Sequence, residues 1–235
     1  MNGKRSERFF SEEENARIRS AIKDAEGGTA GEIVAMVVDR SDSYREAETL
    51  GAVLTAALCG FLVEIAFRLV PLLLPAAGWG HGGGIGADLV LYGVSVWTYV
   101  PLVFFLFFPA RYLFRKFETL KLPFVGRKRI DQAVRERAVR AFYEKGLYKT
   151  RDETGILIFL SLLEHKVWIL GDRGIDARIS HDRWQSLAKD LSRGMRENRA
   201  CDALCSVISA CGDELARHFP RKSDDTNELA DDVIR

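Results

Sequence analysis

Carboxylate and hydroxyl side chains directly follow an apolar stretch near the start of the chain. Residues 32–39 form this stretch, and Asp39, Ser41 and Asp42 come at its end. Open α/β sheets bind ligands at the carboxyl ends of their strands, and oxygen donors of this kind suit Ca²⁺ or Mg²⁺. We therefore predict Asp39 and Asp42 as metal ligands in a candidate ligand loop that includes Ser41. The alternative is a charged loop that only faces solvent.

Two later loops also carry carboxylates beside apolar stretches. Asp152 lies in a charged run at residues 151–153, and Asp172 lies beside Arg173 between two glycines. We predict both as candidate ligand loops, although turn geometry alone also accounts for the pair at 172–173. The sequence contains neither GxSxG nor HExxH, and the histidines at 165, 181 and 218 stand alone. It assigns no catalytic residue.

A different pair of charges lies inside an apolar run. Glu64 and Arg68 are near the middle of residues 52–74, where one unpaired charge costs roughly 3 kcal/mol on membrane-insertion scales. Their spacing places both on one face of a helix, so they can pair. We predict an intramembrane polar pair that fixes a hairpin or an oligomer. The alternative is a transport or sensing role.

Residues 52–74 and 89–109 are both predicted transmembrane helices. Each run is at least as long as the roughly 20 residues that cross the hydrocarbon core of a bilayer. The Gly-rich loop between them, residues 75–88, contains no Lys or Arg, whereas basic residues cluster from Arg111 to Arg129. Because cytoplasmic loops retain positive charge, this pattern predicts an external loop and cytoplasmic termini. We expect a multi-pass protein of the inner cell membrane.

The overall charge favours no nucleic-acid partner. The chain has 34 Lys and Arg against 33 Asp and Glu, a net charge of +1. The expected partners are membrane lipids, which the basic stretch contacts, and a protein partner or a second copy of the chain. Cys201, Cys205 and Cys211 share a helix face with apolar residues and lack a CxxC pair, so buried thiols are expected in place of a zinc site.

The polar segments on both sides of the apolar runs predict one soluble domain. Helices are expected at 11–25, where Ser11 and Glu14 form a capping box, at 127–144, from about 180, and at 201–219. Strands are expected at 32–39, 155–163 and 166–171, the last two as an antiparallel hairpin. The first strand is apolar throughout and is expected in the centre of the sheet.

These elements predict an α/β fold, a small mixed β-sheet covered by helices, with a two-helix transmembrane hairpin inserted after the first strand. The soluble domain comprises residues 1–50 and 111–219. Residues 220–235 are rich in Asp and Glu and are expected to form a disordered acidic tail.

Several of these segments together resemble the TPM domain family, in its membrane-anchored bacterial form. The resemblance rests on the helix at 10–26, the entry to the first strand at 29–34, the stretch from Asp39 to Tyr44, and residues 154–158 and 167–175. It implies an α/β sandwich and, in some relatives, acid phosphatase activity or a calcium site in acidic loops. Many relatives carry a signal peptide, whereas this sequence shows none and has its spans inside the domain.

The leading hypothesis for function is an interaction or assembly module held at the membrane. One alternative is a metal-assisted phosphatase that uses the loops at 39–42 and 151–153, with Ca²⁺ or Mg²⁺ as cofactor. Another is an oligomeric membrane sensor that uses Glu64.

Overall fold

A computed structural model describes residues 5–73, 85–221 and 233–234 of the chain. The contacts divide the chain into two compact units. Unit 1 comprises residues 1–43 and 127–235, and unit 2 comprises residues 44–126. Unit 2 is therefore an insertion, in sequence, between two parts of unit 1.

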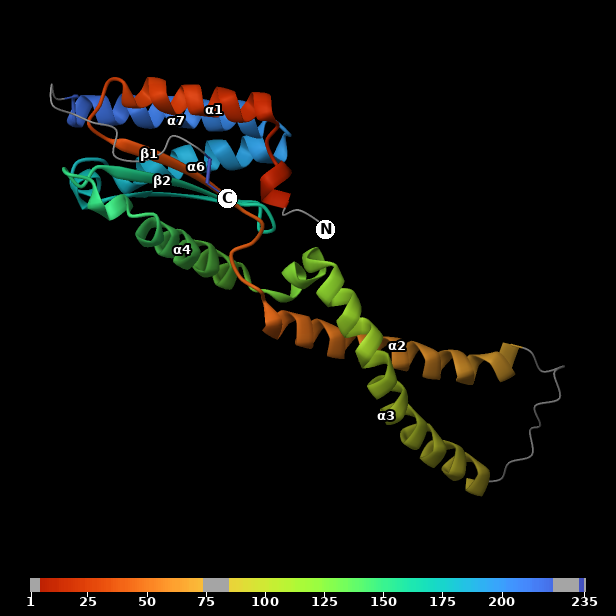
Figure 1. The fold of residues 1–235 in the computed structure, drawn as a ribbon. Coiled ribbons are helices and arrows are strands. Elements are labelled where there is room, and N and C mark those ends of the chain that lie inside the picture. Colours follow the sequence, from red (N-terminus) through yellow and green to blue (C-terminus); the bar gives the residue numbers. More distant parts are fainter. Residues whose placement is uncertain (1–4, 74–84, 222–232, 235) are drawn as a thin grey trace. The chain divides into compact units, whose positions relative to one another are not determined.

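Unit 1 is built on a three-stranded mixed sheet (Figure 1). Its strands are β1 (Glu32–Val38), β2 (Gly155–Ser161) and β3 (Lys166–Gly171). Their order is β1-β2-β3, with β1 and β2 parallel and β2 and β3 antiparallel. The predicted mixed sheet and the β2–β3 hairpin are confirmed.

The prediction that the first strand is central in the sheet is wrong, because β2 holds that place. All residues of β1 are nevertheless buried, since helices cover both faces of the strand. Its outer edge bonds a residue from the end of the chain: Val37 donates to the carbonyl of Ile234 at 2.9 Å, and Ile234 donates to that of Ala35 at 2.9 Å. The burial of a strand therefore shows that both of its faces are covered, and it does not show whether the strand has a neighbouring strand on each side.

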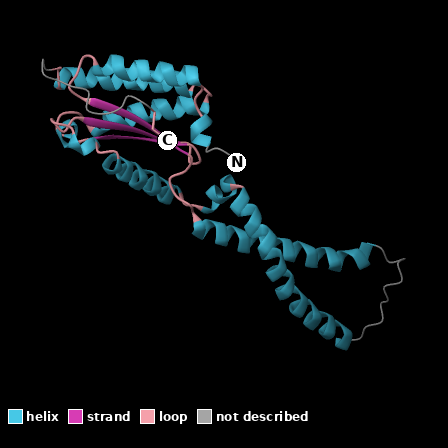
Figure 2. Cartoon of the chain, viewed as in Figure 1, coloured by secondary structure: helices cyan, strands magenta, loops and turns pink. Residues whose placement is uncertain are grey.

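Helices form a layer on each face of the sheet (Figure 2). One face packs against α1 (Glu12–Glu26), α6 (His181–Arg196) and α7 (Ala200–His218). The other face packs against α4 (Arg127–Glu144). The predicted capping box is present, with Ser11 as the N-cap residue of α1. The short elements η1 (Arg5–Arg8), η4 (Leu147–Lys149) and α5 (Arg173–Asp176) were not predicted.

The predicted tail is ordered where its ends meet unit 1. Pro220 forms an isolated bridge with Thr29, and Ile234 forms one with Met36. The prediction of a disordered segment from residue 220 to residue 235 therefore does not hold at these two positions. Residues 222–232 and 235 lie outside the described part of the chain.

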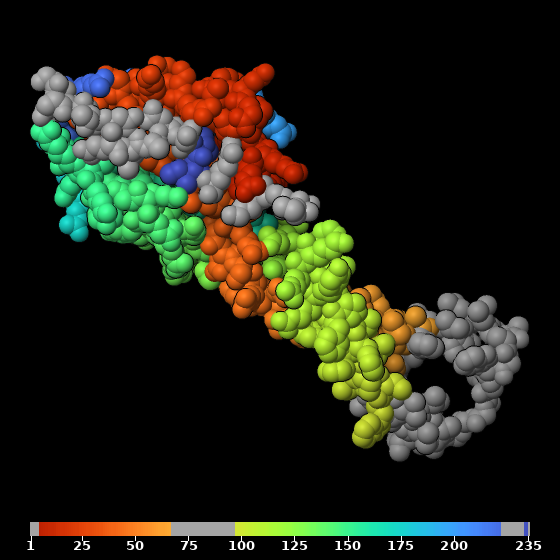
Figure 3. Space-filling view, viewed as in Figure 1, coloured from red at the N-terminus to blue at the C-terminus, as the bar shows by residue number. Residues whose placement is uncertain are grey.

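Unit 2 is a pair of long helices that pack against each other, followed by a short 3₁₀ segment (Figure 1). In the space-filling view, the described atoms of the first helix, in orange, lie beside those of the second, in yellow-green (Figure 3). The helices are α2 (Arg45–Leu73) and α3 (Ile85–Lys116), and η3 (Glu118–Phe124) follows. A Cβ added at Gly51 would meet Phe114 at 2.4 Å, and one at Gly60 would meet Val103 at 2.9 Å. The two helices are therefore antiparallel and in close contact at these glycines.

Both helices of unit 2 are long and apolar enough to cross a membrane. The qualifying stretches among the described residues are Arg45–Ala66 and Trp97–Lys116, and most of their side chains are exposed. Helix α2 begins before the predicted span and α3 continues beyond it. The predicted external loop lies mainly outside the described residues, which resume at Ile85.

Candidate functional site

The loop after β1 forms a hydrogen-bonded network with the end of β2. The Ser41 amide donates to Oε1 of Glu164 at 3.0 Å, and the Ser41 hydroxyl donates to Oγ of Ser161 at 2.8 Å. Ser161 in turn donates to the second carboxylate oxygen of Glu164. Ser161 is the last residue of β2 and Glu164 lies in the β2–β3 turn, and both side chains are buried. The predicted loop residue Ser41 thus takes part in a contact between the loop and β2, and its role in binding a ligand stays a prediction.

Glu164 is a network residue that the sequence analysis did not single out. Its position in a two-strand turn normally faces solvent, and no local pattern marks it as buried. Only the parallel pairing of Val38 with Ser161, which brings the ends of β1 and β2 together, would have placed Glu164 next to the loop after β1.

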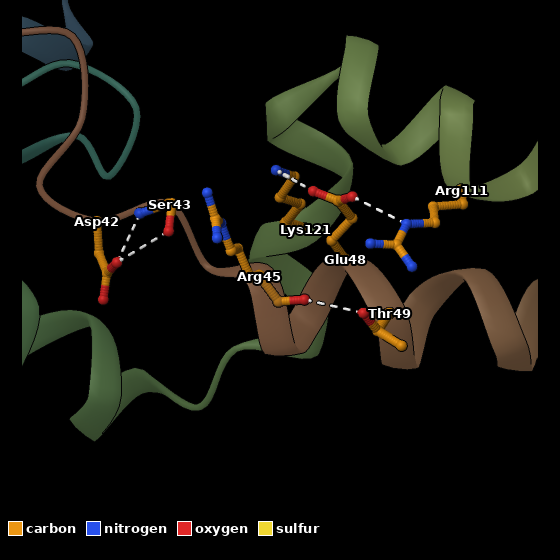
Figure 4. Close-up of polar contacts among 7 residues, drawn as sticks. All are labelled: Asp42, Ser43, Arg45, Glu48, Thr49, Arg111 and Lys121. Carbon is orange, nitrogen blue, oxygen red and sulfur yellow. Dashed lines mark hydrogen bonds and ion pairs between the residues drawn. The ribbon is translucent and has the colours of Figure 1, made fainter.

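Asp39 and Asp42 accept hydrogen bonds from residues in and beside their own loop, and their role as metal ligands stays a prediction. Oδ1 of Asp39 accepts from the Ser6 amide at 2.5 Å. Asp42 accepts from the Ser43 amide at 2.6 Å through one oxygen (Figure 4) and contacts Arg129 at 2.5 Å through the other. Among the described residues, no group of three His, Cys, Asp or Glu side chains is placed to hold a metal ion. A guanidinium at Asp42 competes with a cation for the same oxygen.

The two later loops meet at the other end of β2. The Asp172 amide donates to the carbonyl of Gly155 at 2.9 Å. A Cβ added at Gly174 would come within 2.9 Å of the Asp152 carbonyl oxygen and closer still to that of Glu153, so the two loops touch through their backbones. Asp172 is buried, caps α5 by accepting from the Arg173 amide at 2.8 Å, and keeps its second oxygen without a hydrogen bond among the described residues.

The candidate loops therefore lie at opposite ends of one sheet. Glu32 pairs with Gly155, next to the Asp152 loop, whereas Val38 pairs with Ser161, next to the Asp39 loop. Six strand steps of about 3.3 Å separate the two ends by roughly 20 Å. The prediction that residues 39–42 and 151–153 act together in one phosphatase site is wrong on this geometry, because no single phosphate group reaches both.

One carboxyl group near Asp172 has a perturbed pKa. Partial burial raises the pKa of Asp176, the nearby His181 lowers it, and the charge of Asp172 raises it further, with a net upward shift. Two carboxyl groups beside each other in a partly desolvated turn favour protonation of one of them.

In unit 2, a cluster of charges joins the start of α2, the end of α3 and η3 (Figure 4). Glu48 contacts Nζ of Lys121 at 3.1 Å and Nε of Arg111 at 3.5 Å. The sequence analysis did not single out Glu48. Lys121 was counted among the basic residues expected at lipid headgroups, but its side chain is 5% exposed and contacts Glu48 instead.

The predicted intramembrane pair is described for one partner only. Glu64 lies in α2 and is half-buried, within the stretch that is apolar enough to span a membrane. The side chain of Arg68 lies outside the described residues. Pairing of Glu64 with Arg68 stays a prediction.

Comparison with known proteins finds a family match for one segment of the chain, most of which lies in unit 1. Residues 124–214 match the family model of the TPM domain. The chain contains a TPM domain. Its fold is similar to that in the NMR structure of the BA42 protein from the psychrophilic bacterium Bizionia argentinensis, with a TM-score of 0.54 and 18% identity over 96% of this chain and 94% of that one. No curated protein matches the chain.

The matched part of the TPM domain contains only some of the candidate residues. It includes Ser161, Glu164 and Asp172, whereas Asp39 and Asp42 precede it. The structure nevertheless joins β1 and its loop to the matched segment, since Ser41 bonds both Ser161 and Glu164. Unit 1, which contains most of the matched segment, is thus assembled from two pieces of sequence separated by unit 2.

Proposed function

We propose that the chain is a multi-pass membrane protein in which the helical hairpin, with spans at 52–74 and 89–109, holds the TPM domain at a bilayer. The outward faces of α2 and α3 support this proposal most directly. Leu58 is 58% exposed and Phe105 is 71% exposed, in stretches that are apolar overall. A helix in the core of a soluble protein buries such side chains, whereas lipid accepts them.

The proposed orientation places both termini in the cytoplasm of a bacterial-type cell and the residues around 75–88 outside. The loop at 75–88 contains no Lys or Arg, and Arg115 and Lys116 are exposed at the end of α3. Each cation near anionic headgroups contributes about 1 kcal/mol of attraction. Reporter fusions at both termini test the orientation, and an active periplasmic reporter at either one would contradict it.

We further propose that the TPM domain serves as an interaction or assembly module, with a protein partner or a second copy as its target. The polar groups of the loop after β1 support this role, because Asp39, Asp42 and Glu164 each bond a neighbouring segment and so fix the shape of that loop. Crosslinking in intact membranes, followed by purification in detergent, is expected to recover a stoichiometric adduct. A chain that remains uncrosslinked and alone would contradict the proposal.

A phosphatase assay separates this module from the metal-assisted enzyme. The purified chain is incubated with a generic phosphate ester, with and without Mg²⁺ or Ca²⁺. We expect no turnover that needs both the cation and the carboxylates of Asp39 and Asp42, because Arg129 already contacts Asp42. Asp39→Asn and Asp42→Asn should therefore leave any observed turnover unchanged. Turnover that both substitutions abolish in a folded protein would favour the enzyme.

A further inference from the structure

The third strand of the TPM domain has an open edge. Strand β3 is the last in the order β1-β2-β3, and no described segment bridges to its outer side. The Asp172 amide donates to the Gly155 carbonyl, and these two residues continue the pairing register of β2 and β3 by one position. Hydrogen-bonded pairs alternate along antiparallel strands, so the backbone N–H and C=O groups of Val167 and Ile169 point away from β2.

A cavity lies along this edge. It has a volume of about 310 Å³ and is lined by β3, by one side of α6 and by Asp131 of α4. Val167 and Ile169 line it, as does Trp184 from α6. Trp184 is 2% exposed, yet its indole N–H has no hydrogen-bond partner among the described residues. Buried indoles usually donate a hydrogen bond, so this donor indicates an acceptor that the described residues do not supply.

The rim of the cavity is positively charged. Lys189 and Arg196 on α6 are exposed and line it, together with His165, His181 and Lys166. Asp131 is the acidic residue in the lining, and it is in an ion pair with Lys166. Lys189 and Arg196 therefore give the rim a net positive charge, which favours an acidic occupant.

We propose that an acidic segment of a partner protein binds here in extended conformation and adds a fourth strand beside β3. Its backbone pairs with the outward groups of Val167 and Ile169, its acidic side chains meet Lys189 and Arg196, and one of its acceptors takes the Trp184 N–H. Strand addition to a sheet edge is an established mode of peptide recognition, in which main-chain hydrogen bonds give affinity and flanking pockets give specificity. This inference rests on the proposed role of the TPM domain as an interaction module.

A labelled peptide of alternating Glu and Val, titrated into the chain in detergent micelles, tests the proposal. We expect saturable binding that weakens with salt. The same peptide with N-methylated backbone amides keeps its charge but cannot pair with a strand, and a Lys and Val peptide reverses the charge. Both are expected not to bind. Equal binding of the N-methylated peptide, or no binding of the acidic one, would overturn the proposal.

A charge reversal with a matched control locates the site. Lys189→Glu on the rim is expected to weaken binding about tenfold. Lys23→Glu makes the same change of charge on α1, outside the cavity lining, and is expected to leave binding unchanged. Both positions are exposed, so neither variant threatens folding. Equal effects of the two variants would show that net charge alone attracts the peptide and would overturn the site.

Amide hydrogen exchange reports the strand itself. Exchange at Val167 and Ile169 is expected to slow when the acidic peptide binds. Exchange at these amides that is already slow without the peptide, and that becomes slower as the protein concentration rises, would mean that a second copy of the chain covers the edge. This result would overturn the proposal. A chain that crosslinks to a partner in membranes but does not bind the peptide keeps its role as an interaction module and loses only this site.

Discussion

The two compact units of the chain treat similar side chains in opposite ways. Phe159 in β2 is fully buried in the TPM domain, whereas Phe105 in α3 is 71% exposed. Both belong to segments rich in apolar residues. In water, apolar side chains are more stable when they are buried in a core, whereas in a hydrocarbon solvent they can remain on the surface without this cost. The difference is the one expected if, as proposed, unit 1 folds in water and unit 2 exposes its apolar side chains to lipid.

Truncation of the two phenylalanines is the strongest way to break this comparison. Phe159→Ala is expected to lower the free energy of unfolding by about 4 kcal/mol, because it leaves a cavity in a packed core. Phe105→Ala is expected to change it by less than about 1 kcal/mol, since its ring already lies on the surface of the protein. Urea denaturation in mild detergent, followed by far-UV circular dichroism, measures both. Similar losses would mean that Phe105 packs against protein.

The charge cluster at the base of the hairpin tests how much unit 2 relies on polar contacts. Glu48→Gln removes the carboxylate charge that Lys121 contacts inside the unit. Loss of one partner from a buried ion pair is expected to destabilise by about 3 kcal/mol. The control Glu46→Gln, on the exposed side of the same helix, is expected to cost at most about 1 kcal/mol. Thermal unfolding in detergent measures both, and equal shifts of Tm would contradict a buried role for Glu48.

Close contact between the helices of unit 2 sharpens the comparison further. Gly60→Leu forces a side chain against Val103 and Tyr99, which a Cβ alone would meet at 2.9 and 3.2 Å. Overpacking of this kind is expected to cost about 2 kcal/mol. In the Gly60→Leu variant, the yield of disulfide between cysteines introduced on α2 and α3 should therefore fall. Gly126→Leu, where an added Cβ meets nothing, is the control. Unchanged crosslinking would show that the helices are not in contact at Gly60.

A small pH effect on stability is expected in unit 1. The pKa of Asp176 is raised in the folded state by partial burial and by Asp172, so ionisation at neutral pH opposes folding. Stability from the protonated form is complete below the unfolded pKa and is lost as the pH rises through the folded value. Asp176→Asn should therefore raise Tm slightly at pH 7 and lose this advantage below pH ~4. An advantage that persists in acid would exclude this cause.

Local signals in the sequence predicted the elements of the TPM domain well. The capping box at Ser11 and Glu14 predicted the start of α1, and the helical period of apolar residues predicted both ends of α4. The apolar runs predicted β1, β2 and β3 because each lies between turn residues. These signals depend on neighbours along the chain and need no knowledge of the fold.

The contacts between distant segments were not predictable in the same way. The acidic composition after residue 220 concealed Ile234, which bonds the outer edge of β1. The bonds of Glu164 to Ser41 and Ser161 require the register of a parallel pair that is interrupted by unit 2. For the same reason, the sequence could not reveal that the Asp39 and Asp152 loops lie at opposite ends of the sheet.

Extraction of native membranes with alkaline carbonate tests most directly whether unit 2 lies in lipid. The chain should stay in the pellet, and Phe105→Asp, which puts a charge on the exposed apolar face at a cost of about 3 kcal/mol for insertion, should shift a fraction of it to the supernatant. The control Lys23→Glu, which changes the charge of an exposed residue in unit 1, should leave the chain in the pellet. Release of the unmodified chain into the supernatant would contradict the account.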